Sequence, residues 1–377
     1  MAAIRSWGIN ARRGESAMEQ GFPIIRVEGE PYDRGHQYGN AAQDRITVTI
    51  EAYKMAFAHF AHLDWPDACA RAQAYMEEIE AYAPEALAEM RGIADGAGRR
   101  LEEILALNAR TEIMLTANIC CGCTAVAVLP ELTVSGHTFI GQNWDWISAV
   151  KSSCVLLQVK QPDKPDFLTF VEAGLLAKTG LNSAGIGLCA NALISDQDRG
   201  EKGVPFHVIL RKILDASRLD EAIAAVILPS RASSANYLLA SVEGEAIDLE
   251  AAPPAVGYHY PLDGFLTHTN HFTSGLSGIR DVGLTVFPDS LIRDSRAYRR
   301  LKRWPGKIDR KNLEELFRDH VNFPHSICRH PDPQKPPAEQ IESVGSVIMD
   351  LDRGELFLSD GPPCTHAYRR VSLRDET

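Results

Sequence analysis

The chain has 377 residues, of which 45% are hydrophobic and 24% are charged, so it has enough apolar side chains for a large core. Its net charge of −11 argues against nucleic acid or an anionic membrane as the main partner, and no apolar run is long enough for a membrane helix. Residues 1–20 lack the apolar segment of a secretory signal. We therefore expect a cytoplasmic protein in which residues 1–21 form a disordered tail.

In chain order, the apolar pattern predicts a strand at residues 22–28 and then a helical section that ends near residue 118. Strands dominate after that, and the later helices are predicted at residues 203–215, 220–226, 293–304 and 313–320. The predicted strands are short apolar runs bounded by Gly, Pro or Asp, at residues 123–129, 138–145, 154–159, 167–172, 185–190, 236–242, 246–249, 265–269, 344–351, 355–359 and 367–373. Helices in blocks between hairpin-linked strands predict an α+β fold in which sheet packs on sheet and helices lie outside.

The strongest local pattern is a β-hairpin that begins at Gly122-Cys123. Residues 130–136 carry the turn residues Pro, Ser and Gly, and they separate two buried strands. Val134 is equidistant from Cys123 and Asp145, and residues equidistant from a turn lie opposite each other in an antiparallel pair. We therefore expect the Cys123 thiol near the Asp145 carboxylate, with Asn143 close by.

Gly122-Cys123 is also the candidate site of chemistry. If the Cys123 thiol attacks the Gly122 carbonyl, an N-to-S acyl shift gives a thioester, and its hydrolysis leaves Cys123 with a free α-amino group. This amine has a reference pKa of about 7.7–8.0, so it can act as the base for the thiol of the same residue. Glycine before the nucleophile tolerates a strained backbone that exposes the carbonyl. The alternative is a buried cysteine beside a tight glycine turn, and spacing alone does not decide between the two.

Two further polar positions suit this chemistry. We expect Asp145 to position the new ammonium group and to hydrogen-bond the thiol, with a cap on the following turn as the alternative. Asn270 ends a predicted strand, and its amide N–H₂ is a candidate donor to a tetrahedral oxyanion, an effect worth about 3 kcal/mol. A turn asparagine is the commoner role. His268 and His271 flank Asn270, and we expect them to be hydrogen-bonded scaffold rather than catalytic groups.

Three cysteines in four residues, Cys120, Cys121 and Cys123, allow another interpretation, as half of a zinc site or as a redox pair. A zinc site needs further ligands at regular spacing. The sequence has no second Cys-x-x-Cys, and His268 and His271 lie far along the chain. We therefore expect no metal and no cofactor.

Across nearly its whole length from about residue 22, the chain resembles the acyl-coenzyme A:isopenicillin N acyltransferase (penicillin acyltransferase) family of the N-terminal nucleophile hydrolases. The resemblance rests on short motifs that are weak singly but specific in their order and spacing. These motifs are Asp95-Gly96-Ala97, Leu107-Asn108-Ala109-Arg110-Thr111-Glu112, Gly122-Cys123-Thr124, Gly141-Gln142-Asn143-Trp144-Asp145, Glu172-Ala173-Gly174, Asn182-Ser183-Ala184-Gly185, His268-Thr269-Asn270-His271, Pro288-Asp289-Ser290 and Ser326-Ile327-Cys328-Arg329.

The resemblance implies a four-layer αββα sandwich and a precursor that cuts itself before Cys123. Residues 22–122 would form a mainly helical α chain that stays bound to a β chain, residues 123–377, as one integrated domain. The resemblance also implies Cys123 as the nucleophile, Asp145 as its orienting carboxylate and Asn270 as the oxyanion donor. The supporting residues that it implies are Thr124, Asn143, Glu172, His268, His271 and Arg329.

Two departures from the family pattern concern the substrate. Val344 stands where the penicillin enzyme has an arginine, and Ala125 stands where it has a threonine. We therefore expect an amide hydrolase or acyltransferase for small N-acyl compounds, with hydrolysis favoured and with acyl-CoA or β-lactam compounds as related partners. A binding protein without catalytic activity on the same fold is a further alternative. The acyl group, the amine and the oligomeric state stay open.

Overall fold

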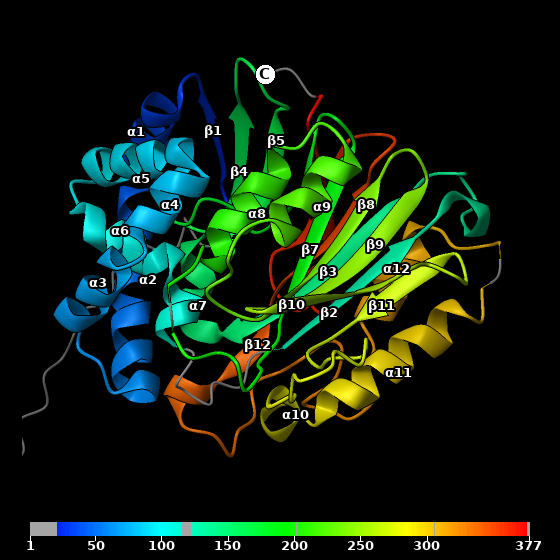
Figure 1. Ribbon diagram of the computed structural model, residues 1–377. Helices are drawn as coiled ribbons and strands as arrows, with labels where there is room; N and C mark the ends of the chain where they lie inside the picture. Colours follow the sequence, from blue (N-terminus) through cyan, green and yellow to red (C-terminus); the bar gives the residue numbers. More distant parts are fainter. Residues whose placement is uncertain (1–20, 115–121, 201, 305, 375–377) are drawn as a thin grey trace, which may run out of the picture.

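Figure 1 shows the computed structural model of the chain, which describes residues 21–114, 122–200, 202–304 and 306–374. Two β-sheets lie face to face, and helices cover the outer face of each sheet. The predicted α+β fold with four αββα layers is confirmed. Residues 1–20, most of the predicted tail, lie outside the described residues.

The first sheet has eight strands among the described residues, in the order β1-β4-β5-β6-β7-β8-β9-β10. β1 runs parallel to β4, and the other neighbours are antiparallel. The strands are β1 (Ile24–Glu28), β4 (Cys154–Lys160), β5 (Phe167–Glu172), β6 (Thr179–Asn182), β7 (Ile186–Ala192), β8 (Ala235–Ser241), β9 (Glu245–Ala252) and β10 (Ala255–His259). β6 and β10 were not predicted, because β6 is a four-residue strand without an apolar run and β10 is a partly exposed edge strand.

The second sheet has the order β11-β2-β3-β12-β13-β14. Its strands are β2 (Gly122–Val128), β3 (Phe139–Ile147), β11 (Phe265–His268), β12 (Ile341–Asp350), β13 (Glu355–Ser359) and β14 (Tyr368–Ser372). The predicted hairpin is therefore β2 and β3, at the middle of this sheet. The register between β3 and β12 shifts between Ser343 and Gly345, where β12 carries an irregularity.

The helices form three groups around the two sheets (Figure 1). The helical section that precedes β2 contains α1 (Pro31–Ala41), α2 (Gln43–Ala56), α3 (Trp65–Gln73), α4 (Met76–Tyr82), α5 (Pro84–Ala97), α6 (Leu101–Asn108) and α7 (Arg110–Ile113). The outer face of the first sheet is covered by α8 (Phe206–Leu214) and α9 (Leu219–Ile227). The second sheet is covered by α11 (Asp289–Leu301), which follows α10 (Gly283–Val286), and by α12 (Arg310–Phe317).

Every residue of β2 and β3 is buried, because the second sheet lies between the first sheet and helices α11 and α12. Side chains of a strand alternate between the two faces of its sheet. Cys123 and Ala125 accordingly belong to the large core toward the first sheet, whereas Val126 and Val128 belong to the smaller core under α11 and α12. Cys123 and its neighbour Thr124 therefore face different surroundings.

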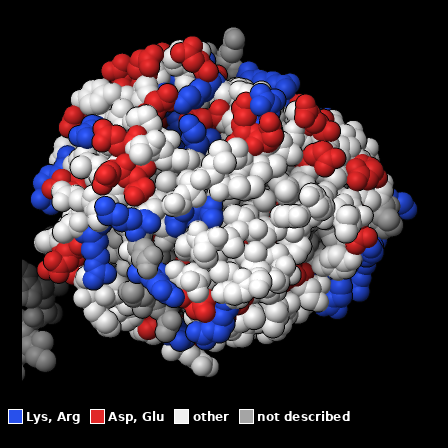
Figure 2. All heavy atoms as spheres, viewed as in Figure 1, with Lys and Arg blue, Asp and Glu red and all other residues white. Residues whose placement is uncertain are grey.

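No described helix combines the length and the apolar character that crossing a membrane requires. Figure 2 shows charged side chains of both signs around the margin of the displayed face and mostly uncharged side chains in its middle. Charge of one sign does not form a continuous surface in this view.

Candidate active site

The register of the hairpin places Gly122 opposite Asp145 and Cys123 opposite Trp144. The predicted pairing of Cys123 with Asp145 is therefore wrong by one residue, because the centre of the hairpin lies just before Val134 rather than on it. A shift of one residue moves a side chain to the other face of the sheet. The Cys123 thiol and the Asp145 carboxylate consequently leave the strand pair on opposite faces.

A cavity with mostly apolar walls opens at the Cys123 thiol, which is 5% exposed. Its volume is about 80 Å³, and its walls come from the helical section, from both sheets and from the start of α8. The lining residues are Arg110, Thr111, Met114, Cys123, Trp144, Trp146, Lys178, Ala190, Ala192, Leu193, Ile194, Phe206, Ser234 and Ala235. The cavity suits a small apolar group held against the sulfur.

Burial raises the pKa of the Cys123 thiol to about 11, and the negative charge of Asp145 adds to this rise. The sulfur is therefore protonated near neutral pH, and its attack on a carbonyl carbon requires a base. No hydrogen bond joins a described histidine to this thiol. An α-amino group on Cys123 would be the nearest basic group to the sulfur, because it belongs to the same residue.

Lys178 lines the same cavity and was not singled out from the sequence. Its Nζ lies 3.0 Å from the centroid of the Trp144 ring and 3.5 Å from Oε2 of Glu172. Burial lowers the pKa of Lys178 to about 7, although the Glu172 carboxylate opposes this shift. Glu172, expected as a supporting residue, also pairs with Arg110 at 3.2 Å. It therefore forms ion pairs with both Arg110 and Lys178, the two cations in the described cavity lining.

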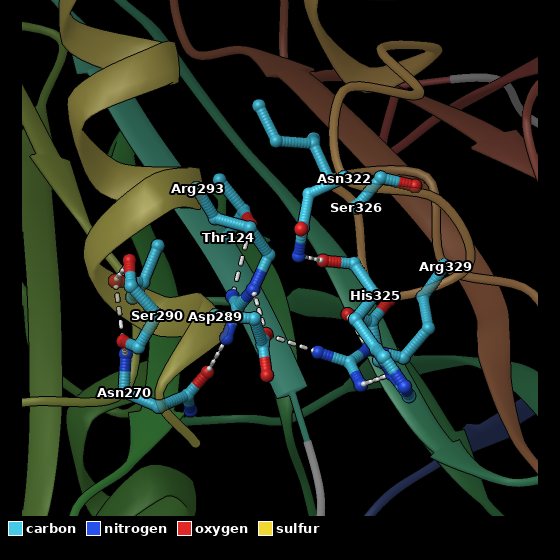
Figure 3. A network of polar contacts seen from close by, with 12 residues as sticks. Thr124, Asn270, Asp289, Ser290, Arg293, Asn322, His325, Ser326 and Arg329 are labelled. Atoms are coloured by element: carbon cyan, nitrogen blue, oxygen red, sulfur yellow. Dashed lines mark hydrogen bonds and ion pairs between the residues drawn. The ribbon is translucent and has the colours of Figure 1, made fainter. Parts of the chain in front are cut away.

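On the other face of β2, Arg293 of α11 holds the backbone around Cys123 (Figure 3). Its Nη1 donates to the carbonyl oxygen of Cys123 at 2.6 Å and to Oγ1 of Thr124 at 3.2 Å. Its Nη2 donates to Oδ1 of Asn270 at 2.9 Å, and its Nε donates to Oδ2 of Asp289 at 2.7 Å. The guanidinium is buried, so it fixes this peptide unit without competition from bulk water.

Asn270 lies two residues after the last residue of β11, close to the end of the strand as the sequence predicts. Its Oδ1 accepts the backbone N–H of Cys123 at 2.9 Å, and its Nδ2 donates to the carbonyl oxygen of Ala192, which lines the cavity, at 3.0 Å. Its own backbone N–H donates to Oγ of Ser290 at 2.7 Å. The side-chain amide therefore bridges the nitrogen of Cys123 and the rim of the cavity.

Asp145 lies against the peptide that precedes Cys123. A side-chain carbon added at Gly122 would come within 2.8 Å of Oδ2 of Asp145 and 3.1 Å of Nε of Arg329. The Oδ1 atom of Asp145 accepts the Ser343 hydroxyl at 2.7 Å, and Oδ2 lies 3.4 Å from Nε of Arg329. Burial raises the pKa of Asp145, while the charges of Arg329 and Arg293 oppose the rise.

The short distance from Asp145 and Arg329 to Gly122, and not the strained backbone that we expected, explains the glycine at this position. The residue lies in β2, and its φ is not in the left-handed region. Glycine is required because Asp145 and Arg329 occupy the space that a side chain would take.

The remaining supporting residues hold the segments around Asp145. Nδ2 of Asn143 donates to the carbonyl oxygens of Phe317 and Ile327, both at 2.8 Å, and so it fixes the loop that carries Arg329 rather than lying beside the thiol. Arg329 also contacts the Asp289 carboxylate, as Figure 3 shows. Two arginines and two aspartates thus form one network behind the Gly122–Cys123 peptide.

The two histidines contact scaffold groups. His268 lies 3.0 Å from Oε1 of Glu250 through Nε2, and 2.9 Å from the carbonyl oxygen of Thr269 through Nδ1. Burial alone would lower the pKa of His268, but the carboxylates of Asp248 and Glu250 raise it to about 9. Nδ1 of His271 lies 2.8 Å from Oγ of Ser290, and burial lowers the pKa of this ring. Both histidines support the segment that carries Asn270.

Two other expectations concern residues away from the thiol. Val344 is fully buried in β12, beside the register shift, and it offers no polar group to the cavity. Cys120 and Cys121, on which the zinc or redox interpretation depends, lie outside the described residues.

Arg293 and Lys178 are the residues that sequence reasoning missed. Arg293 lies one helical turn after Asp289 of the motif Pro288-Asp289-Ser290, and this Asp-to-Arg spacing of four could have indicated both Arg293 and a helix that begins at Asp289 rather than at the predicted residue 293. Lys178 follows an apolar stretch with no motif of its own, so its position near Cys123 is a consequence of sheet topology alone.

Comparison with known proteins identifies relatives of the chain in sequence and in fold. Residues 133–337 match the family described as acyl-coenzyme A:6-aminopenicillanic acid acyl-transferase. The chain is 30% identical over 362 residues, 94% of each sequence, to the acyl-coenzyme A:6-aminopenicillanic-acid-acyltransferase 40 kDa form of Emericella nidulans. Among solved structures, a single-residue variant of conjugated bile acid hydrolase from Clostridium perfringens superposes with a TM-score of 0.50 at 14% identity, over 68% of this chain and 94% of that one. This last likeness concerns the fold.

Proposed function

Because the chain belongs to the acyl-coenzyme A:6-aminopenicillanic acid acyltransferase family of enzymes, we propose that it cuts its own Gly122–Cys123 bond and then uses Cys123 as an N-terminal nucleophile. Its substrates would be small amides, whose acyl group passes to the Cys123 sulfur. Water is the default acceptor for that group, so hydrolysis is favoured over transfer.

The observation that carries this proposal is the way in which the peptide unit of Cys123 is held. Its N–H is bound by Asn270, its carbonyl oxygen is bound by Arg293, and its thiol alone faces the cavity. β11 pairs with β2 only as far as Ala125, so at Cys123 buried side chains take the place of a neighbouring strand as partners of the backbone. The arrangement keeps the residue in place when the bond before it is broken.

In self-cleavage, the Cys123 sulfur adds to the Gly122 carbonyl carbon, and the C–N bond breaks to give a thioester. The Cys123 nitrogen gains the proton that the sulfur gives up. Asp145 lies against Gly122 on the face opposite the thiol, so we assign it the role of orienting the scissile peptide. Water then hydrolyses the thioester and leaves a free carboxyl group on Gly122.

In the mature enzyme, the new α-amine takes the thiol proton as the sulfur attacks the substrate carbonyl. Asn270 can hold this amine through Oδ1, the atom that accepts the same nitrogen before the cut. Its Nδ2 lies at the cavity rim and is the candidate donor to the tetrahedral oxyanion. The amine of the substrate leaves with a proton, and water releases the acyl group from sulfur.

We further propose that the α chain stays bound after the cut. Residues before the cut supply β1, which pairs with β4, and Arg110, which lines the cavity and pairs with Glu172. The mostly apolar cavity suits the acyl part of the substrate, such as that of an acyl amino acid, an acylated amine or a β-lactam side chain. The buried Val344 in place of an arginine argues against penicillin-type recognition of the amine part.

The test is trapping of the acyl-enzyme. Mature protein is mixed rapidly with a panel of N-acyl compounds that carry a chromogenic amine, and the β chain is weighed at each time. We expect a burst of amine and a β chain heavier by one acyl group, both absent in Cys123→Ala whose two chains are produced separately. A burst in Cys123→Ala, or an acyl group found on another residue, would contradict the assignment of the nucleophile.

A further inference from the structure

A second cluster of reactive side chains lies in the loops behind Arg329, away from the Cys123 cavity. It consists of His320, Cys328, His330 and Cys364, each of which directs one ligand atom to a common point. The four ligand atoms all lie within 4.8 Å of one another. Two cysteines and two histidines are the donor set of a structural tetrahedral zinc site.

The three distances from Nε2 of His330 are close to the edges of such a tetrahedron, and the other three are within 4.8 Å. Nε2 of His330 lies 3.1 Å from Nε2 of His320, 3.5 Å from Sγ of Cys328 and 3.4 Å from Sγ of Cys364. Zinc bonds of about 2.0–2.1 Å to nitrogen and about 2.3 Å to sulfur imply edges of about 3.3 to 3.8 Å between the ligand atoms. The side chains therefore need little movement to take up the ion.

Hydrogen bonding alone does not explain this convergence. A ring nitrogen of histidine either donates one hydrogen bond or accepts one. Nε2 of His330 nevertheless has three polar atoms directed at it, one of them the ring nitrogen of another histidine. A cation at the centre would satisfy all four groups at once.

The surroundings suit a structural ion that can enter from solvent. His320 is exposed, Cys364 and His330 are partly exposed, and Cys328 is buried, so the cluster lies at the surface with one ligand anchored inside. The ring of Phe323 packs against both histidines, with centroid distances of 6.0 Å to His320 and 5.3 Å to His330. The backbone N–H of Cys328 donates to the carbonyl oxygen of Asp319 at 3.0 Å, which shapes the loop before any ion binds.

We propose that these four side chains bind one zinc ion, which fastens the segment 319–330 to the segment 361–366. Binding converts both cysteine thiols to thiolates and releases their two protons to solvent, while both histidines bind as neutral rings. The two segments are already joined by Arg318, whose Nε donates to the carbonyl oxygen of Pro363 at 2.8 Å.

The site would also fix part of the catalytic network. Arg329 lies between the ligands Cys328 and His330, and its side chain reaches Asp145 and Asp289. Its backbone N–H donates to Oγ of Ser343, the hydroxyl that Asp145 accepts. The zinc ion would thus hold the segment that positions Arg329, although it contacts none of the reacting atoms.

The experiment uses the full chain without a histidine tag, purified under reducing conditions and loaded with Zn²⁺ before desalting. Elemental analysis should give about one zinc per chain. Cobalt added to the stripped protein should give thiolate-to-cobalt charge-transfer bands and the visible bands of tetrahedral Co²⁺. His320→Ala and Cys364→Ser alter the exposed side of the cluster, so we expect them to fold and to lose most of the zinc and both sets of bands.

Two control variants separate this site from other donors. Cys123→Ala, together with changes of Cys120 and Cys121 to Ser, should keep the zinc, and so should His366→Ala, which lies two residues from Cys364. The proposal is overturned if the wild-type protein holds no zinc after loading, or if the triple-cysteine control loses it. A Cys328–Cys364 disulfide in protein that is native without metal would also overturn it. These readouts do not depend on self-cleavage or turnover.

Discussion

The strand pair β2–β3 has two very different faces at Cys123. On one face, the thiol and Trp144 border a cavity whose described lining carries two charged side chains, Arg110 and Lys178. On the other face, a buried network of arginines and aspartates contacts the backbone at Gly122 and Cys123. The Cys123 thiol thus lies in a weakly polar space, while the charges act through the peptide groups on either side of it.

This difference suggests that holding the peptide and controlling the thiol are tasks of different residues. Charged groups that hold the scissile peptide need not touch the thiol, and burial keeps the thiol neutral until a local base appears. If that is correct, changes on the charged face should affect self-cleavage most, and changes on the cavity face should affect substrate chemistry and pH behaviour.

The largest effect is expected from Arg293→Met. The change removes the buried cation that binds Cys123, Asn270 and Asp289 together. Loss of one partner from a buried ion pair costs about 3–5 kcal/mol, so both the free energy of unfolding and the rate of self-cleavage should fall sharply. Denaturant unfolding and a time course on denaturing gels measure the two effects.

Two matched variants sharpen this test. Arg296→Met removes a cation from the same helix that pairs with Asp319 instead, and it should cleave at the wild-type rate. Arg293→Lys keeps the charge but loses the planar fork of donors, and it should recover stability more than cleavage. Equal cleavage by Arg293→Met and Arg296→Met would show that the charged face does not hold the scissile peptide.

A further effect on self-cleavage is expected from Gly122→Ala. The added carbon would lie within 2.8 Å of the Asp145 carboxylate, so the scissile peptide or the carboxylate has to move, and maturation should slow by at least about tenfold for ~1.4 kcal/mol of strain in the reacting geometry. The effect should be confined to maturation. When the two chains are produced separately, with the β chain starting at Cys123, activity should be the same with either residue at 122. A loss of activity there would mean that the close approach matters for turnover as well.

A separate effect, on turnover, is expected from Asn270→Ala in mature protein. Removal of an oxyanion donor lowers the turnover rate by about 10²–10³-fold. His268→Ala, in the same segment, should cost less, because its ring contacts Glu250 and Thr269 rather than Cys123. The acylation rate in a stopped-flow burst compares the two variants. A larger loss in His268→Ala would point to a histidine base.

The last prediction concerns stability rather than reaction rate, through the titration of Lys178. Its pKa falls from 10.5 in the unfolded chain to about 7 in the folded protein, so the unfolded chain binds more protons between these values. The free energy of unfolding should therefore rise with pH across this range and lose that contribution as pH falls toward 7, with a slope of up to about 1.4 kcal/mol per pH unit. Lys178→Met should unfold with a flatter pH profile, and equal profiles would contradict the lowered pKa.

The layers of the fold follow from features that the sequence displays directly. Apolar runs bounded by turn residues mark most of the strands, and the order of the family motifs identifies the sandwich. Strands β6 and β10 could not be predicted in this way. β6 is only four residues long, and β10 is a partly exposed edge strand that is defined by its pairing with β9.

The candidate site was predictable in its residues but not in its register. Cys123, Asp145 and Asn270 do lie close together, yet the position of the hairpin centre decides which face each side chain takes, and local sequence fixes that centre only to within a residue. Arg293 and Lys178 reach Cys123 from distant elements. The cluster of His320, Cys328, His330 and Cys364 lacks the paired spacing of common zinc motifs, so folding alone reveals it.

The measurement that tests the central claim most directly is the intact mass and N-terminal sequence of the purified protein after incubation at neutral pH. We predict two chains, the larger of which begins Cys123-Thr124-Ala125, and a single uncut chain for Cys123→Ala. A wild-type protein that stays intact, or one cut at another peptide bond, would contradict the assignment of Cys123 as a self-generated N-terminal nucleophile.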